Sequence, residues 1–302
     1  MPQFPNFSLR CLLLFVSSLW LGCEKTITVD IPDLEPRIVL NCTVSPNEQP
    51  FVYLSKPFTQ YDSTFLHNAT VQWYENGNLI DTIPQSGWGT SFGSIYIYPF
   101  ISNLPQVGNT YTIKVSAPNL PSVEATQTIP PTVSLQNPVF THHVYTRDNI
   151  LFNRLQATLH DDPNTENFYR FAFYTYHTKN KTYSIRSMSK ESASNMDFML
   201  FGHGFSFGQF YYLSDYHFNG QSKTFLFDLT DYTHIYLNDT ITLIAISQQL
   251  SPDLYYYAQD IEAGQGDAEF FNEPVTVYSN VQNGIGIFGA FSSDTLRLLL
   301  EP

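Results

Sequence analysis

The feature that most constrains this chain is a pattern of short strand-like segments separated by turn residues. Residues 69–74 read Ala-Thr-Val-Gln-Trp-Tyr, with apolar and polar side chains alternating, and residues 79–83 form a second such run. Between them stands Glu-Asn-Gly-Asn, centred on Asn76 and Gly77. An Asn-Gly pair between two alternating runs is the strongest short-range signal for a β-hairpin. We therefore expect a hairpin here, within a larger β-sheet.

The rest of the first half repeats this pattern. Further strands are predicted at residues 37–44, 51–54, 94–101, 110–116 and 123–129. With the hairpin, this makes roughly seven short strands in about a hundred residues, the number and spacing typical of an immunoglobulin-like β-sandwich. Pro130 and Pro131 then interrupt the pattern. We place a domain boundary there, so that residues 37–130 form the first sandwich.

The second half, residues 131–302, is predicted to form a larger sandwich with one helix. Strands are expected at residues 151–160, 168–176, 182–188, 198–213, 223–229, 240–247, 275–278, 286–291 and 295–300. A helix is expected at about residues 252–263, because Ser251 is a good N-cap and Pro252 suits the first helical position. The predicted fold class is therefore all-β, with two β-sandwich domains.

The amino-terminal residues 1–22 have the features of a lipoprotein signal peptide. The apolar run that begins at Cys11 is too short to span a bilayer comfortably. It ends in Leu21-Gly22-Cys23, and a small residue directly before Cys is similar to the bacterial lipobox, although Trp20 departs from that motif. We expect Cys23 to be lipidated and residues 23–36 to form a tether. An ordinary cleaved signal or a buried first helix remain the alternatives.

Charge and cysteine content narrow the possible functions. Lys and Arg total 14 against 27 Asp and Glu, so the net charge of −13 disfavours binding to nucleic acid. An acidic surface serves solubility, or attracts cations or basic partners. If Cys23 carries lipid, Cys42 has no disulfide partner, and its apolar neighbours indicate a core position.

A serine-hydrolase motif occurs once. Gly204-Phe205-Ser206-Phe207-Gly208 matches the pattern G-x-S-x-G, and Asp215 with His217 or His234 could complete a triad. The motif needs a strained turn between a strand and a helix. Here strand-forming residues follow, so a bend within β structure is the favoured interpretation and no catalytic residue is assigned.

Two groups of potential metal ligands also have simpler explanations. Residues 161–166, Asp-Asp-Pro-Asn-Thr-Glu, offer oxygen donors for Ca²⁺ but lack the spacing of a calcium loop and resemble a common turn. His142 and His143 are adjacent, and adjacent residues of a regular strand face opposite sides. We expect no metal site and no cofactor.

Aromatic residues are concentrated between residues 198 and 218. Exposed, they would form a platform for a glycan or an apolar partner, and buried, they would form the core of a sandwich. The residues proposed for such a ligand platform are Phe205, Phe207, Tyr211, Tyr212 and Tyr216.

Several longer segments carry a resemblance to a known family. They are Cys23-Glu24-Lys25, residues 29–32, 74–77, 111–118, 167–171, 250–255 and 273–275, and above all residues 279–290, Ser-Asn-Val-Gln-Asn-Gly-Ile-Gly-Ile-Phe-Gly-Ala. On these segments the chain resembles a Bacteroidota lipoprotein family of unknown function, domain of unknown function 4249. Genes of that family often neighbour those of TonB-dependent outer-membrane receptors. The family has no established catalytic residues, so none is transferred.

These observations lead to one main expectation. The chain is expected to be a non-enzymatic lipoprotein anchored in the outer membrane, an accessory to a TonB-dependent transporter, on the periplasmic or cell-surface face. A glycan- or peptide-binding surface module is the alternative, and a hydrolase centred on Ser206 is the second alternative. Affinity isolation of membrane complexes, glycan and peptide binding, and labelling of Ser206 by a fluorophosphonate probe distinguish the three interpretations.

Overall fold

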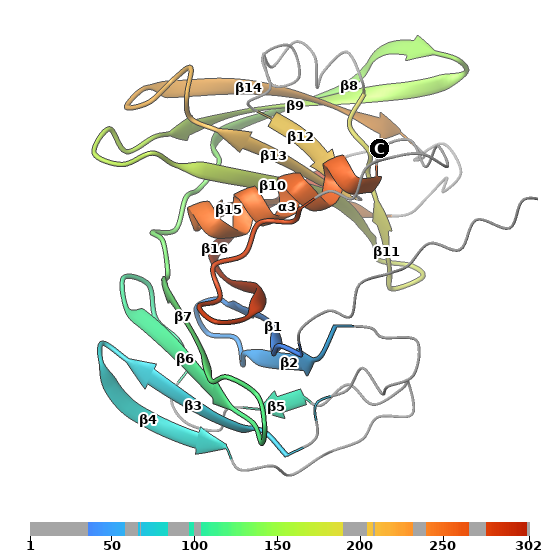
Figure 1. The fold of residues 1–302 in the computed structure, drawn as a ribbon. Helices are drawn as coiled ribbons and strands as arrows, with labels where there is room; N and C mark the ends of the chain where they lie inside the picture. Colours follow the sequence, from blue (N-terminus) through green and yellow to red (C-terminus); the bar gives the residue numbers. More distant parts are fainter. Residues whose placement is uncertain are drawn as a thin grey trace, which may run out of the picture. The chain divides into compact units, whose positions relative to one another are not determined.

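The computed structural model describes residues 36–57, 66, 68–83, 97–99, 104–189, 204–207, 209–231, 240–265 and 276–300. The expected signal peptide, Cys23 and the tether up to residue 35 lie outside the described residues. Among the described residues, no helix is both long enough and apolar enough to cross a membrane. The architecture is all-β with one described helix, as the strand pattern predicts (Figure 1).

Among the described residues, seven strands precede the expected domain boundary. They are β1 (Val39–Val44), β2 (Phe51–Ser55), β3 (Thr70–Glu75), β4 (Asn78–Ile83), β5 (Ile97–Pro99), β6 (Thr110–Ser116) and β7 (Val123–Thr128). Strands β3 and β4 form the predicted hairpin, and Asn76 and Gly77 at its turn both have positive φ. A four-stranded sheet of order β4-β3-β6-β7 faces β1 and β2 across one hydrophobic core, in which Trp73 stacks on Tyr111.

Nine further strands follow. They are β8 (Gln136–Arg147), β9 (Ile150–His160), β10 (Phe168–His177), β11 (Thr182–Ile185), β12 (Gly204–Phe207), β13 (Phe210–Ser214), β14 (Ser222–Asp231), β15 (Ile241–Leu250) and β16 (Ile285–Leu300). Strands β14, β9 and β8 form a three-stranded sheet. A second core, rich in phenylalanine, lies between that sheet and strands β10, β15 and β16.

The last strand joins the two halves of the chain. Residues 285–290 of β16 pair in parallel with β1, and residues 291–300 pair antiparallel with β15. The result is one nine-stranded sheet of order β12-β13-β10-β15-β16-β1-β2-β5, with β11 paired to β10. The first core contains residues up to Ile129 and the second begins at Val133, but Phe288 and Ala290 from the far end of the chain complete the first core.

Both smaller sheets pack on the same face of the nine-stranded sheet. Along β16, the even-numbered residues Phe288 and Ala290 enter the first core, and Leu296, Leu298 and Leu300 contact the second. Because side chains of a strand alternate between faces, all of these lie on one side. The odd-numbered residues point to the other side, which carries helix α3 (Pro252–Gln265) (Figure 1). We call this second side the helix-side face.

Helix α3 is fixed by its amino-terminal residues. The backbone N–H of Leu254 donates to the hydroxyl of Ser251, as expected for an N-cap, and the same hydroxyl accepts the N–H of Ala290. Leu254, Tyr255 and Ala258 bury the helix against Phe168 and Leu250 of the sheet. The predicted range of about 252–263 is confirmed, and the helix continues to Gln265.

Two glycines of segment 279–290 stand where neighbouring elements pack closely against it. A Cβ at Gly286, whose φ is 115°, would stand 2.1 Å from the carbonyl oxygen of Leu40. A Cβ at Gly289 would stand 2.8 Å from Leu254 of the helix. The absence of side chains at these positions lets β1 and α3 approach β16 closely.

The structure differs from the predicted elements in four places. Residues 136–147 form β8, which was not predicted. Two register shifts interrupt the alternation of its side chains, and that alternation is the signal that identifies a strand. The single strand expected at residues 198–213 contains a hairpin of β12 and β13. The two strands expected at 286–291 and 295–300 are one continuous strand, and described residues 276–278 form no strand.

Candidate functional site

The open part of the helix-side face presents large apolar side chains to solvent. Tyr183 is 65% exposed, Ile185 is 51% exposed and Leu299 is 65% exposed. They come from β11 and β16, the two outer members of a four-strand segment that also contains β10 and β15. Clusters of exposed apolar side chains on a protein surface often mark an interaction site, so this exposure indicates a candidate contact surface.

Strand pairing aligns these side chains in two rows. One row runs Tyr183, Tyr176, Thr242 and Leu299 across the four strands. The rings of Tyr176 and Tyr183 have centroids 4.9 Å apart. The next row runs Ile185, Tyr174, Ile244 and Arg297. Together we call six residues of these two rows the tyrosine face: the half-buried Tyr174 and Tyr176, and the exposed Tyr183, Ile185, Arg297 and Leu299.

The guanidinium group of Arg170 lies between the tyrosine face and helix α3. Arg170 on β10 lies over three rings, with centroids at 4.6 Å for Phe210, 5.1 Å for Phe291 and 5.8 Å for Tyr212. Its Nε donates to the side-chain oxygen of Gln248 at 2.5 Å. Cation–π contacts of this kind fix a positive charge beside an aromatic surface. Sequence reasoning did not single out Arg170, because its partners are distant along the chain.

Of the five residues of the predicted aromatic platform, the structure describes the side chains of three, and these differ in burial. Tyr212 is buried beneath the helix, and Tyr211 is half-buried with its hydroxyl accepting the backbone N–H of Met188. Burial raises the pKa of Tyr211. Tyr216 is 65% exposed. Phe205 and Phe207 lie in β12, and their side chains are outside the described residues. Exposed tyrosines therefore occur at Tyr216 of the predicted platform and also at Tyr183, on a strand that was not singled out.

The G-x-S-x-G segment lies in a hairpin. Ser206 belongs to β12 and pairs with Tyr211 of β13, so strand follows strand where a hydrolase elbow requires strand, turn and helix. His234 is outside the described residues. Asp215 is buried, and its carboxylate accepts the backbone N–H of Asn167 at 2.8 Å. This bond ties the end of β13 to the start of β10.

The acidic segment 161–166 forms part of the same buried network. The side-chain nitrogen of Asn167 lies 3.2 Å from a carboxylate oxygen of Asp161 and 3.2 Å from one of Asp215. Tyr169 donates to Asp161, and Gly220 N–H donates to it at 2.6 Å. Burial, with a smaller contribution from Asp161, raises the pKa of Asp215 despite the bonds from Asn167. These carboxylates accept hydrogen bonds from protein donors, and the bonds connect the loop before β10 with the loop after β13.

The two adjacent histidines lie in a bulge of β8. His143 has φ 53° and its backbone N–H donates to the side chain of Asn153. The bulge disrupts the expected alternation, and the rings of His142 and His143 have centroids 6.0 Å apart. Among the described residues, no group of three or more His, Cys, Asp or Glu side chains could hold a metal ion.

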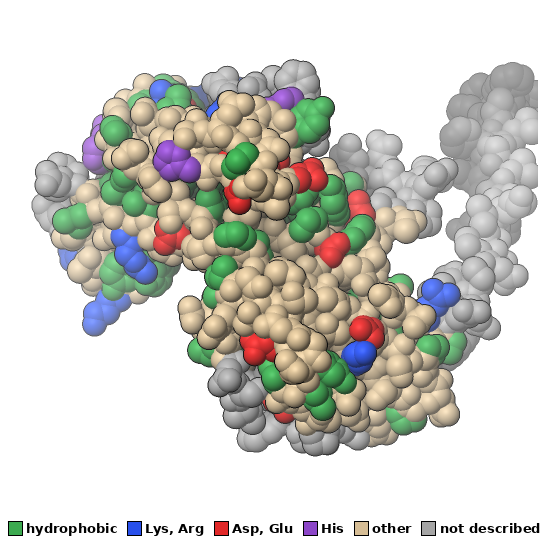
Figure 2. All heavy atoms as spheres, turned by 90° about the vertical axis from the view of Figure 1, so that its left-hand side faces the viewer, with side chains coloured by type: hydrophobic (Ala, Val, Ile, Leu, Met, Phe, Trp, Pro, Cys, Tyr) green, Lys and Arg blue, Asp and Glu red, His purple; other side chains and the backbone are tan. Residues whose placement is uncertain are grey.

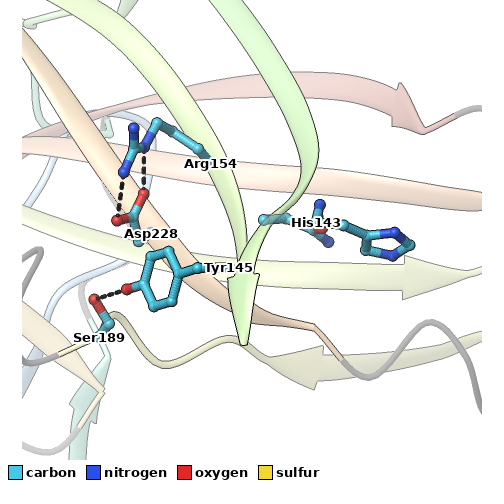
Figure 3. Close-up of polar contacts among 6 residues, drawn as sticks. His143, Tyr145, Arg154, Ser189 and Asp228 are labelled. Carbon is cyan, nitrogen blue, oxygen red and sulfur yellow. Dashed lines mark hydrogen bonds and ion pairs between the residues drawn. The ribbon is translucent and has the colours of Figure 1, made fainter. Parts of the chain in front are cut away.

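On the outer face of the three-stranded sheet, polar side chains bind one another. Arg154 and Asp228 face each other in a two-bond ion pair of 2.5 and 2.8 Å, and Tyr145 reaches across to the hydroxyl of Ser189 at 2.8 Å (Figure 3). His143 points away from this pair (Figure 3). A second view shows acidic, basic and hydrophobic side chains interspersed over another part of the surface (Figure 2). On the three-stranded sheet, the exposed apolar residues Val139 and Leu226 flank Gln156 in a single row, whereas the tyrosine face has two such rows.

Comparison with known protein families finds a match that covers most of the chain. Residues 24–297 match the family described as "Domain of unknown function (DUF4249)". Among curated proteins, none matches the chain. The matched range includes every described strand up to most of β16 and therefore both cores and the helix-side face.

Proposed function

The chain belongs to the DUF4249 family, and from that premise we propose that it is a non-enzymatic cell-envelope lipoprotein that docks through its tyrosine face onto an outer-membrane protein. A TonB-dependent transporter is the proposed partner, and acyl chains on Cys23 hold the two together at the outer membrane. The observation that carries the docking proposal is the exposure of Tyr183, Ile185 and Leu299 on one flat face.

The chemistry of the face suits a protein partner. Interfaces are enriched in Tyr and Arg, and the aligned rows contain three tyrosines and Arg297. A sheet of four hydrogen-bonded strands holds these side chains in fixed positions, so little ordering entropy is lost on docking. Burying one large apolar side chain completely contributes about 1.5–3 kcal/mol, so the three exposed ones together provide several kcal/mol.

The proposed anchor makes such an interface effective at low intrinsic affinity. A protein and a transporter confined to one membrane meet at a high effective concentration, as two linked binding modules do. Lipidation contributes about 0.8 kcal/mol per buried CH₂, which keeps the protein at the membrane. Support for this part comes from the leader and from the position of Cys23.

Affinity isolation from solubilised envelopes tests the proposal. The tagged protein is expected to recover an outer-membrane receptor, and the triple variant Tyr183→Ser, Ile185→Ser, Leu299→Ser is expected to lose it. A loss of about 3 kcal/mol corresponds to about 100-fold in affinity. The matched control is Val139→Ser with Leu226→Ser, which removes exposed apolar side chains from the three-stranded sheet. Failure of the unmodified protein to recover any receptor contradicts the proposal.

A further inference from the structure

A small hollow lies at the other end of the helix-side face, beside the β1–β2 hairpin. Its volume is about 160 Å³, and Thr43, Ser45, Glu48, Gln49 and the β2 aromatics line it, together with Pro50. At about 30 Å³ per water molecule, it has room for roughly five waters. That is the scale of a single ring-shaped ligand rather than of a cofactor.

Two aromatic side chains form the apolar part of the hollow. Phe51 is 43% exposed and Tyr53 is 41% exposed, and both are on β2. They are two residues apart, so they point to the same face, while Val52 between them is buried in the first core. Exposed rings held on a sheet can stack on the apolar face of a ligand.

Polar groups of several kinds form the rest of the lining. The hydroxyl of Ser45 donates to one carboxylate oxygen of Glu48 at 2.6 Å. Among the described residues, the other oxygen of that carboxylate accepts no hydrogen bond. Thr43 adds a hydroxyl and Gln49 an amide, so the hollow offers both donors and acceptors.

An unsatisfied acceptor lies next to the hollow. Asn41 is directly opposite Tyr53 and two residues before Thr43, on the same face of the sheet. Its side-chain oxygen is buried and has no hydrogen-bond partner within the part of the chain that the structure describes. Asn41 is not among the residues that line the hollow, so this atom is a neighbour of the hollow and the ligand contacts are assigned to the lining residues alone.

We propose that this hollow binds one neutral sugar unit of a saccharide. The C–H face of a pyranose would stack on Tyr53 or Phe51, and its hydroxyls would pair with Glu48, Gln49 and the hydroxyl of Thr43. A neutral polyol fits better than an anion, because the only charge in the lining is the negative one of Glu48. It also fits better than an ammonium group, which has donors for the carboxylate but no acceptor for the amide N–H and hydroxyl donors of the lining. The proposal is independent of the docking function above.

Binding of defined neutral tetrasaccharides tests the proposal. Maltotetraose, cellotetraose, xylotetraose and mannotetraose are titrated into the full mature chain by calorimetry, with saturation-transfer NMR as a second readout. At least one is expected to bind, and Tyr53→Ala or Glu48→Gln is expected to weaken it about tenfold or more. Tyr183→Ala, on the tyrosine face, is the matched control and should leave affinity unchanged.

Three results would overturn the proposal. The first is no binding of any of the four tetrasaccharides. The second is binding that survives both Tyr53→Ala and Glu48→Gln, which would place the site elsewhere. The third is binding of choline, used as a probe for ammonium ligands, in the absence of saccharide binding. Because Glu48 and Tyr53 are exposed, their replacement should leave the unfolding midpoint unchanged, and this measurement confirms that each variant is folded.

Discussion

Gly286 lies so close to Leu40 that a Cβ on Gly286 would stand 2.1 Å from the Leu40 carbonyl oxygen. The contact is between backbones, so no side-chain movement can relieve it. It occurs where β16 pairs in parallel with β1 and closes the first core with residues from the end of the chain. The two halves of the chain are therefore joined at this contact.

Replacing this glycine should destabilise the whole protein. Gly286→Ala combines a φ of 115° with a clash against β1, and we expect a loss of more than about 3 kcal/mol in the free energy of unfolding. Gly108→Ala is the control, because Gly108 has φ 81° but open space around it, and should cost about 1–2 kcal/mol. Urea unfolding followed by the fluorescence of buried Trp73 measures both. Equal effects of the two variants would show that the contact with Leu40 is unimportant.

The fold was largely predictable because its signals are local. The β3–β4 hairpin follows from Asn76-Gly77, and α3 follows from Ser251 and Pro252, each within a few residues of the element it determines. The pairing of β1 with β16 was not predictable, because it joins residues about 250 positions apart and leaves no local pattern. Strand β8 was missed because its bulges remove the alternation that identifies a strand.

The candidate site was predicted less well than the fold. Composition indicates that aromatic residues are abundant but does not say which are buried. Tyr212 and Tyr183 occur in similar strand-like segments, yet α3 covers the first and leaves the second open. Only the placement of the helix on the sheet distinguishes them.

Buried Asp215 should make stability depend on pH. Its pKa is raised mainly by burial, so the native protein binds this proton more tightly than the unfolded chain, whose Asp has a pKa of about 3.9. The contribution to stability is complete below that value and is lost as pH rises through the raised pKa. Asp215→Asn removes this term while keeping an acceptor for the Asn167 N–H. The variant should therefore gain stability relative to the parent as pH rises.

Urea unfolding of both proteins between pH 3 and 7 measures this difference. The matched comparison is Asp162→Asn, since the Asp162 side chain lies in the exposed turn and accepts bonds from Asn164. A stability difference between Asp215→Asn and the parent that does not change with pH would contradict the assignment. So would a change in the opposite direction.

Breaking the Arg154–Asp228 pair should cost more than removing both partners. The Asp228 side chain is 4% exposed, so Arg154→Met leaves a buried carboxylate without its cation, and we expect a loss of about 2–3 kcal/mol. The double variant Arg154→Met, Asp228→Leu also removes the buried carboxylate, so it should recover part of that loss. Thermal and urea unfolding of the three proteins give the comparison. A double variant less stable than Arg154→Met would argue against the pair's role.

Thiol content distinguishes a lipidated chain from a merely cleaved one. Of the three cysteines, Cys11 would be removed with the proposed leader, and lipid on Cys23 would block its sulfur as a thioether. Cys42 is buried in the first core, and burial raises its pKa well above the usual range. Native mature protein should therefore not react with a disulfide reagent at pH 8. After unfolding in urea we expect one thiol per chain.

A count of two thiols after unfolding would mean that Cys23 is present but unmodified. The variant Cys42→Ala provides the control: it should show no thiol if Cys23 carries lipid and one thiol if Cys23 is unmodified. The same preparations, separated into membrane and soluble fractions, should show that Cys23→Ala releases the protein from the membrane.

The most direct measurement of the central claim is site-specific photo-crosslinking in intact cells. A benzophenone side chain is placed at position 183 on the tyrosine face and, separately, at position 226 on the three-stranded sheet, both exposed in the isolated chain. If the tyrosine face docks onto a membrane partner, position 183 should crosslink to an outer-membrane receptor and position 226 should not. Crosslinking from position 226 alone, or from neither position, would contradict the account.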